Sequence, residues 1–321
     1  MATRITTLGL GKTGISVGLA LPGEKKGIIR VGFDEDKELV KYAKKVKAFD
    51  EYASSAEAAV AQADIVILDL PVDRLRLIFS TVAQKMKANS ILVNMAPLVG
   101  ASTRWAAELL PENIYYINAI PAFNYESLQD VNKEPGNARA DLFEKSLVFI
   151  AGDVNTRQEL INVTVDLVVL LGGTPYFSEP DEVDGLIANV IVLPQLIAAA
   201  LAGATMLQPG WDDNKRLAGN IFNLALKPLE LVNEAEDYGI SMMQNRKNLL
   251  PVLEKYIQVL QQIQQLIIDE DTDGLTAFMV DVLLTRKEWL EKRKEGKWDY
   301  YLSSSIPLKQ EALRRFSGFS S

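Results

Sequence analysis

The first residues with a recognisable chemical pattern form a glycine-rich segment near the N-terminus. An apolar run, Ile5–Leu8, leads directly into Gly9, Leu10, Gly11, Lys12, Thr13 and Gly14, and a helical pattern follows. At a strand-to-helix turn, the first glycine permits the tight turn, the second lets a pyrophosphate approach the backbone, and the third lets the helix pack against the strand. The helix N-terminus then attracts the anion. Taken alone, the pattern also fits a structural turn.

An acid at the end of the next apolar run completes a dinucleotide-binding pattern. Asp34 follows Gly32-Phe33 and lies 20 residues after Gly14. A carboxylate there accepts hydrogen bonds from a ribose 2′-hydroxyl and repels a 2′-phosphate, so the pattern predicts binding of NAD in preference to NADP. Leu70 and Pro71 follow a later apolar run, and we expect them to line the same crevice.

Two residue types that carry much of enzyme chemistry are missing. The sequence has no Cys and no His. Thiol nucleophiles, disulfides, Cys/His zinc sites and imidazole bases are therefore excluded, and no metal site is predicted. Proton transfer is left to Asp, Glu, Lys, Tyr, Ser and Thr.

Length and charge narrow the class of protein. A chain of 321 residues favours two domains, and 48% hydrophobic with 24% charged residues is typical of a folded soluble protein. With 34 Lys and Arg against 42 Asp and Glu, the net charge of −8 has the wrong sign for binding nucleic acid. The N-terminus lacks the cationic and apolar order of a secretory signal, so we expect a cytoplasmic protein.

The elements that position these residues alternate in type up to about residue 178. Helical patterns separate short apolar runs at Ile5–Leu8, Ile28–Phe33, Ile65–Leu70, Ile91–Asn94, Ile114–Asn118, Leu147–Ala151 and Thr174–Phe177. This alternation predicts an α/β domain over residues 1–178, a Rossmann-type doubly wound parallel sheet.

The remaining residues, 179–321, predict an all-α domain. Helical patterns occupy 182–206, 212–238, 245–268, 272–294 and 307–315. Leu186–Leu207 is long enough to cross a bilayer but contains Asn189, Pro194 and Gln195, so we expect a buried helix and not a membrane span. So much apolar surface predicts a homodimer built on the helical domain. The tail from Arg286, with Trp289, Trp298, Tyr300 and Tyr301, is expected to be amphipathic.

Several segments, in their order and spacing over residues 4–265, resemble the prephenate and arogenate dehydrogenase family. They are GLGKTG, ADIVILDLPVDRL (Ala63–Leu75), Ile91–Gly100, ADLFEKSLVFIAG (Ala140–Gly152), Asp181–Leu201 and WDDNKRLAG (Trp211–Gly219). The resemblance implies a Rossmann domain, a helical domain that dimerises, and NAD(P)-dependent oxidation of a ring carbon that bears a hydroxyl. In that family a His removes the hydroxyl proton, and the ring loses carbon dioxide.

The resemblance also shows where this chain departs from the family. The position of the catalytic His falls on Ile120, beside a retained Pro121. Other polar family positions fall on Pro97, Val99, Val183, Val192 and Gln195. Glu126 survives, and so does Arg216, where the family keeps an Arg for a substrate carboxylate. Since a positioned general base contributes about 10²–10⁴-fold in rate, its loss implies a slow enzyme, another base or another substrate.

Three residues are candidates to replace the base, and each has a structural alternative. Tyr125 offers a phenol or packs as an aromatic side chain with a hydrogen-bonded hydroxyl. Lys215 acts as a base if its pKa is depressed, or is a solvated charge. Asp184 accepts a proton or caps a helix. Arg216 likewise either grips a carboxylate or forms an ion pair with Asp212, Asp213 or Glu230.

Two hypotheses about function remain open at this point. The first is an NAD-dependent dehydrogenase that acts on a diverged small carboxylate substrate bound near Ile120, Glu126 and Arg216. The second is a catalytically silent NAD-binding protein, a sensor or regulatory dimer. Turnover of the cofactor distinguishes them, because the second binds NAD without oxidising or reducing it.

Overall fold

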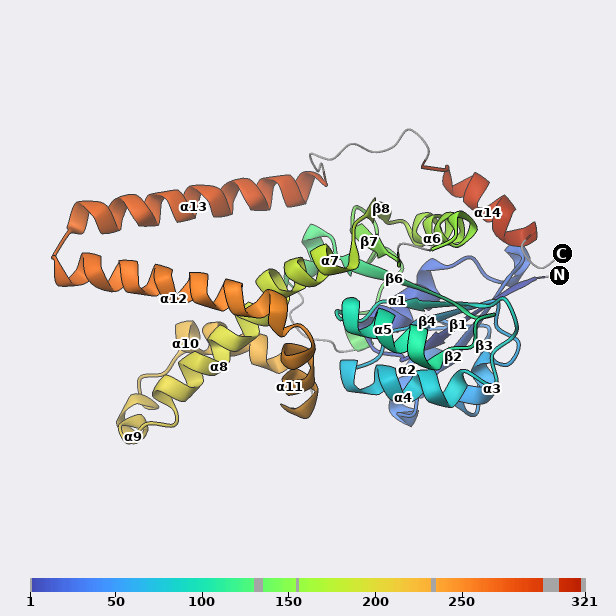
Figure 1. Ribbon diagram of the computed structural model, residues 1–321, viewed down its shortest axis with the longest axis horizontal. Helices are drawn as coiled ribbons and strands as arrows, with labels where there is room; N and C mark the ends of the chain where they lie inside the picture. The colour runs from blue at the N-terminus through green and yellow to red at the C-terminus, as the bar shows by residue number, and fades with distance from the viewer. Residues whose placement is uncertain (1, 130–134, 154–155, 232–234, 297–305, 319–321) are drawn as a thin grey trace.

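An eight-stranded sheet forms the centre of the first part of the chain (Figure 1). The computed structural model describes residues 2–129, 135–153, 156–231, 235–296 and 306–318. The strands, in the order β3-β2-β1-β4-β5-β6-β7-β8 across the sheet, are β1 (Thr3–Leu8), β2 (Ile28–Phe33), β3 (Glu51–Tyr52), β4 (Ile65–Leu68), β5 (Ile91–Asn94), β6 (Tyr115–Ala122), β7 (Leu147–Ala151) and β8 (Thr174–Phe177).

The α/β prediction is confirmed with one correction to strand direction. Neighbouring strands pair in parallel throughout, except that β6 and β7 are antiparallel. The described residues between β6 and β7 hold only the short 3₁₀ helices η2 (Tyr125–Gln129) and η3 (Pro135–Asn137). Without a crossover helix, the chain re-enters the sheet at the end where β6 stops, and Leu147 pairs with Ala122.

Helices cover both faces of the sheet. They are α1 (Lys12–Ala20), α2 (Lys37–Lys45), α3 (Ala56–Val60), α4 (Val72–Val82), α5 (Gly100–Leu109) and α6 (Gln158–Leu171). Alternate residues of β4 enter different cores: Ile65 and Ile67 belong to the apolar cluster that holds α1 and α6, whereas Val66 and Leu68 belong to the cluster of α3 and α4. Burial on both faces explains why the strands appear in the sequence as continuous apolar runs.

The last described helix, α14 (Lys309–Gly318), packs against this first part of the chain and not against the helical part. Ala312 and Phe316 enter the core beside α6, and the Thr3 hydroxyl donates a 2.5 Å hydrogen bond to the carbonyl of Phe316. Arg315 forms a 3.2 Å ion pair with the buried Asp166. The division of the chain at residue 178 stays a prediction. Helix α14 follows that division in the sequence but packs against the part of the chain that precedes it.

The helix that begins at Pro180 is less buried than we expected. It runs through α7 (Pro180–Ile187), the π-helical turn η4 (Ala188–Val192) and α8 (Leu193–Thr205). The turn precedes Pro194, whose missing N–H leaves the regular hydrogen-bond ladder incomplete. Among the described residues, Pro180–Thr205 is the one helix long and apolar enough to cross a membrane, and only 22% of its most apolar window is buried. The prediction of a buried helix is therefore wrong for a single chain.

The predicted helical pattern at 212–238 is also wrong as one helix. The chain forms α9 (Trp211–Asn214), α10 (Asn220–Leu226), η5 (Lys227–Leu231) and α11 (Ala235–Gln244). Gly219 adopts an extended conformation, with φ −119° and ψ −150°, and Pro228 cannot donate a helical hydrogen bond. These two residues break the pattern.

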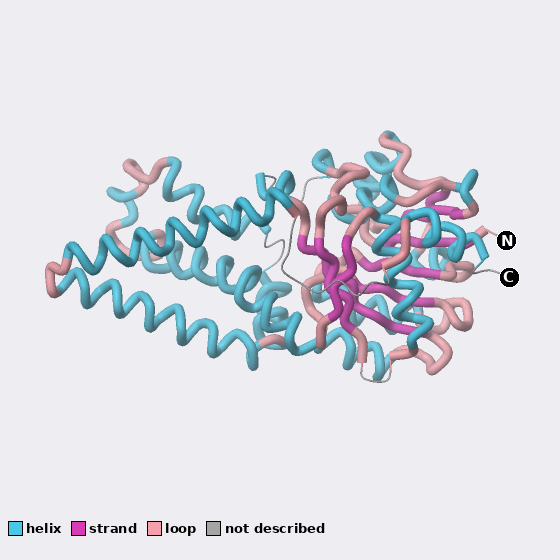
Figure 2. The backbone as a smooth tube through the Cα atoms, turned by 90° about the horizontal axis from the view of Figure 1, so that it is seen from above, coloured by secondary structure: helices cyan, strands magenta, loops and turns pink. Residues whose placement is uncertain are grey.

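Two long helices, α12 (Arg246–Ile268) and α13 (Thr272–Glu295), complete the helical part. They lie side by side and project away from the sheet (Figures 1 and 2). Both match their predicted ranges. Of the tail residues expected to be amphipathic, Trp289 lies on α13 and is 46% exposed, while Trp298, Tyr300 and Tyr301 lie outside the described residues.

Candidate active site and nucleotide loop

The glycine-rich loop has the geometry that its sequence predicts. Gly9 has φ +93°, and a Cβ atom there would lie 2.0 Å from the Asp69 carbonyl oxygen. A Cβ on Gly14 would lie 1.9 Å from the Gly9 carbonyl oxygen. Only glycine fits either position, so the strand, the turn and helix α1 pack closely. At the second glycine, Gly11, the nearest atom to a Cβ would be Asp69 Oδ2, at 3.6 Å.

Asp34 lies beside this loop. Its Oδ2 accepts a 2.6 Å hydrogen bond from the Leu10 N–H, and its Oδ1 accepts a 2.8 Å bond from the Asp36 N–H. The half-buried carboxylate therefore has a fixed orientation at the end of β2. Of the other predicted loop residues, Lys12 is buried and Thr13 is half-buried, and the Leu70 side chain lies 3.2 Å from the Cβ position of Gly9. Pro71 is exposed and precedes α4.

Asp69 belongs, with Leu70 and Pro71, to the strand end that the sequence places at the crevice, but its contact with the loop was not predicted. Its Oδ2 accepts a 2.8 Å hydrogen bond from the Gly14 N–H in the first turn of α1. The same oxygen lies 3.6 Å from the Cβ position of Gly11. The available signal was an acid directly after the apolar run of β4, at the sheet edge where Rossmann ligands bind.

Four of the positions at which the resemblance places polar groups of the family belong to one hydrophobic cluster in this chain. Ile120 is 6% exposed, and it shares one apolar cluster with Val99, Val183 and Val192. Leu249, at the start of α12, packs into the same cluster. These side chains pack against one another in the single chain, and substrate binding near Ile120 stays a prediction.

Asp184 adopts the structural alternative that the sequence left open. Its two carboxylate oxygens accept hydrogen bonds from the Val99 N–H at 2.9 Å and the Gly100 N–H at 2.8 Å, which caps α5. A Cβ on Gly100 would lie 2.8 Å from Asp184 Oδ2, so glycine permits this approach. Burial raises the pKa of Asp184, and the two amide hydrogen bonds oppose that rise.

A buried polar network, which no sequence pattern indicated, holds the start of α5 against the sheet. The Asn118 Oδ1 atom accepts hydrogen bonds from Asn94 at 3.0 Å, Ser102 at 3.2 Å and Tyr116 at 2.9 Å. Asn118 also donates to Thr103 at 3.0 Å. Burial raises the pKa of the Tyr116 phenol. These bonds fix the backbone that Asp184 caps.

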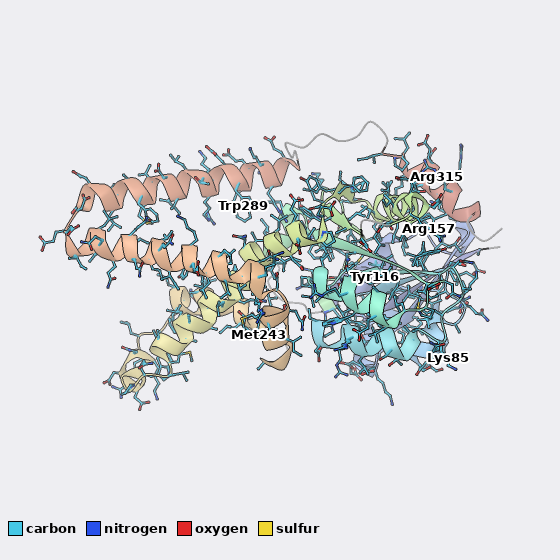
Figure 3. All side chains as sticks on the ribbon, viewed as in Figure 1. Lys85, Tyr116, Arg157, Met243, Trp289 and Arg315 are labelled. Carbon is cyan, nitrogen blue, oxygen red and sulfur yellow. The ribbon has the colours of Figure 1, made fainter. Side chains whose placement is uncertain are left out.

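A polar cavity of about 280 Å³, open to solvent and lined mostly by exposed side chains, lies beside Asp184, where the sheet part meets the helical part. Its lining comes from α5, α7 and the junction of α11 and α12: Arg104, Asp181, Asp184, Met243, Gln244, Asn245, Arg246, Lys247 and Asn248. Met243 marks this junction in Figure 3. The buried Asn245 donates a 2.8 Å hydrogen bond to the Asp184 carbonyl, and Lys247 forms a 2.9 Å ion pair with Asp181.

The structure does not bring the other candidate residues to this cavity. Tyr125 and the exposed Glu126 lie on η2. Lys215 and Arg216 lie at the tip of the helical part that carries α9, far from the sheet (Figures 1 and 2). Within one chain, Arg216 therefore does not reach Ile120.

Lys215 and Arg216 instead form local ion pairs. The Lys215 ammonium lies 2.6 Å from Asp212, and the Arg216 guanidinium lies 3.4 Å from Asp213. The Arg216 side chain is 78% exposed, so the pair contributes about 0–1 kcal/mol and does not brace two helices. Among the residues that the structure describes, no group of three or more acids is placed to hold a metal ion.

Comparison with known proteins identifies the family. The sequence model of the prephenate dehydrogenase nucleotide-binding domain matches residues 17–176, and that of the prephenate dehydrogenase dimerization domain matches residues 179–281. The chain belongs to the prephenate dehydrogenase family. The predicted resemblance is confirmed, and so is the class of fold. The match to the nucleotide-binding domain begins at residue 17, after Gly14. The assignment of the glycine-rich loop therefore depends on the geometry of the loop itself.

Curated relatives and solved structures agree with this assignment. Cyclohexadienyl dehydrogenase of Zymomonas mobilis is 23% identical over 276 residues, which cover 84% of this chain and 90% of that protein. Prephenate dehydrogenase of Bacillus subtilis is 23% identical over 283 residues, covering 86% and 73%. A crystal structure of Aquifex aeolicus prephenate dehydrogenase with hydroxyphenyl propionate and NAD⁺ has a TM-score of 0.74 at 18% identity, covering 90% of this chain and 98% of that chain. Synechocystis arogenate dehydrogenase has a TM-score of 0.68 at 19% identity, covering 89% and 100%.

Restoring the family's imidazole at Ile120 should damage the core and not create a site. We expect Ile120→His to lower the free energy of unfolding by about 1–3 kcal/mol, because the imidazole has no polar partner in the apolar cluster. The control, Ile120→Val, keeps the cluster apolar and should cost about 0.5–1.5 kcal/mol. Urea unfolding measures both. A histidine variant as stable as the wild type would contradict the packed-core account.

Proposed function

We propose that this member of the family is an NAD-dependent oxidoreductase that acts on a small carboxylate other than prephenate. The observation that carries the proposal is the pairing of an intact nucleotide loop, with Asp34 oriented against it, and a hydrocarbon core at the family's catalytic positions. The first feature supports cofactor binding, and the second opposes the family's own substrate chemistry.

The residues present fit NAD. The loop has glycine at positions 9, 11 and 14, which allows the strand, the turn and helix α1 to pack closely and a pyrophosphate to approach the backbone. The Asp34 carboxylate suits a ribose diol and repels a 2′-phosphate. NAD⁺ would supply a hydride acceptor. The A. aeolicus relative was crystallised with NAD⁺, which adds support. Leu70 and Pro71 flank the same edge of the sheet and would line the crevice.

The polar cavity beside α5 is the candidate substrate site in this proposal. Its volume of about 280 Å³ lies near the low end of small-molecule pockets, which favours a small substrate. Arg104 and Arg246 offer guanidinium groups for a carboxylate. The carboxylate class agrees with the hydroxyphenyl propionate bound to the A. aeolicus relative. A role for Tyr125, Glu126, Lys215 or Arg216 in catalysis or substrate binding stays a prediction.

Asp184 is the candidate proton acceptor that the cavity favours. It lines the cavity, and a carboxylate has about four lone-pair positions, so two amide hydrogen bonds leave room for another proton donor. Its raised pKa makes the carboxylate a stronger base than an exposed Asp. The same residue would therefore cap α5 and accept the proton.

We also propose that the chain is a cytoplasmic homodimer. Large apolar side chains of the helical part face outward: Val190 is 69% exposed, Leu207 81%, Leu217 91% and Ile221 87%. Exposure on this scale indicates an interaction surface. The match of residues 179–281 to a dimerization domain supports a second copy of the chain as the partner, rather than a membrane.

Binding of NADH should stabilise the protein more than binding of NADPH. At a ligand concentration 100 times the dissociation constant, we expect stabilisation of about 2.7 kcal/mol. The Asp34→Ala variant should narrow the difference between the stabilisation by NADH and that by NADPH, because it removes both the ribose hydrogen bonds and the repulsion of the 2′-phosphate. Thermal unfolding with each nucleotide tests this. A melting temperature raised by NADPH and not by NADH would refute the cofactor assignment.

A screen of small hydroxy and amino carboxylates with NAD⁺ should find a substrate, detected as NADH absorbance. We expect kcat/KM to rise with pH, because the base acts in its unprotonated form. The midpoint should lie above the ordinary aspartate pKa of about 4, since burial disfavours the charged carboxylate. Asp184→Asn should abolish this dependence. Tight NAD⁺ binding with no turnover of any compound would favour a silent NAD-binding protein instead.

For the substrate so found, Arg104→Met should raise KM about 10–100-fold, since a hydrogen bond to a charged group contributes about 1.5–3 kcal/mol. The matched control is Arg216→Met, which removes an exposed guanidinium at the distant tip. It should leave KM unchanged. If KM rises in the control alone, the carboxylate binds at residues 211–219 and not in the cavity.

A further inference from the structure

The Asp69 carboxylate lies at the part of the nucleotide loop that Rossmann proteins use for pyrophosphate. Its Oδ2 accepts the Gly14 N–H at 2.8 Å and faces the open side of Gly11. Backbone N–H groups at a helix N-terminus are ordinarily the donors for a bound phosphate, and the second glycine of the pattern allows the phosphate to approach. In this chain a side-chain anion occupies one of the N–H groups at the N-terminus of α1.

The backbone around Asp69 holds the side chain in this place. The Asp69 N–H donates a 2.9 Å hydrogen bond to the Leu8 carbonyl, which continues the pairing of β4 with β1. The carbonyl oxygen of Asp69 lies only 2.0 Å from the position that a Cβ on Gly9 would occupy. The strand end and the tight turn therefore fix the Cα position of Asp69 against the loop, and only rotation of the side chain frees the Gly14 amide.

The loop also carries a second carboxylate. Asp34 accepts the Leu10 N–H at 2.6 Å, so two acids engage N–H groups of the same six-residue segment. A pyrophosphate brings further negative charge to this place. Asp34 has a recognised task at the ribose, but a carboxylate at Asp69 repels the pyrophosphate and competes with it for the same amide.

We propose that Asp69 is an internal anion that competes with the cofactor's pyrophosphate and thereby sets a low affinity for the dinucleotide. The inference rests on the proposed function, in which NAD is the cofactor. Binding of NAD requires the carboxylate to leave the Gly14 amide, and dissociation is assisted when the carboxylate returns. Asp69 is thus an affinity-determining residue.

A purely structural role for Asp69 makes a different prediction. As a cap on the first turn of α1, the carboxylate would stabilise the free protein, and its removal would lower the melting temperature without any gain in affinity for NADH. An internal competitor also stabilises the free protein, but its removal tightens binding of the cofactor. Affinity therefore separates the two roles, and the melting temperature of the free protein does not.

The test is calorimetric titration of NADH into the wild type, Asp69→Ala, Asp69→Asn and a control, Glu108→Gln. We expect Asp69→Ala to bind NADH at least ten times more tightly than the wild type. Asp69→Asn should lie between them, because its amide keeps an acceptor for Gly14 but loses the charge. Glu108 lies on the exposed side of α5 and pairs with Arg76 at 3.2 Å. The Glu108→Gln substitution removes one negative charge away from the loop, so it should leave the affinity for NADH unchanged.

The outcomes separate this inference from the proposed function. If the wild type binds NADH and Asp69→Ala binds it equally or more weakly, Asp69 is a structural cap and the inference is overturned while NAD remains the cofactor. If only the Asp69 variants bind NADH, the inference is supported in its strongest form. If neither the wild type nor any variant binds NADH, the proposed function fails, and this inference fails with it.

Discussion

The contact of the Asp184 carboxylate with the Val99 and Gly100 amides joins the helical part of the molecule to the sheet. It places a side chain of α7 at the N-terminus of α5, where the helix dipole and two unsatisfied N–H groups favour an anion. The contact positions Val99 in the apolar cluster on one side and leaves the polar cavity on the other. Both the packed core and the candidate substrate site depend on this arrangement.

The replacements at the family's polar positions form a consistent set. A single apolar residue in a polar pocket would leave neighbouring polar groups without partners, at a cost of about 1–3 kcal/mol for each. Val99, Ile120, Val183 and Val192 belong to one apolar cluster, so the positions that the resemblance assigns to polar groups have the packing of an ordinary core. In the proposed function, the polar site is the cavity beside Asp184.

Local patterns predicted much of the fold and the geometry of the glycine-rich loop. Strands such as β4 and β5 were predicted because burial on both faces produces continuous apolar runs, and Asp34 was found from its spacing to Gly14. The direction of β7 was not predictable, since an apolar run does not encode the end at which the chain enters the sheet. The packing of α14 on β1, the exposure of α8 and the position of Arg216 depend on contacts distant in sequence or on a second chain. The contact of Asp69 with the loop was missed because it follows from the approach of β4 to the loop, which one sequence alone does not reveal.

The central claim is that the cofactor half of the family's site is retained, whereas its substrate half is packed with hydrocarbon. The most direct test is the steady-state rate of prephenate oxidation by the wild-type protein with saturating NAD⁺, measured as NADH formation. The account predicts turnover at least about 100-fold below the enzyme median of about 10 s⁻¹, because the family's imidazole base is absent and Ile120 is buried in the apolar cluster. Turnover near 10 s⁻¹ would contradict it.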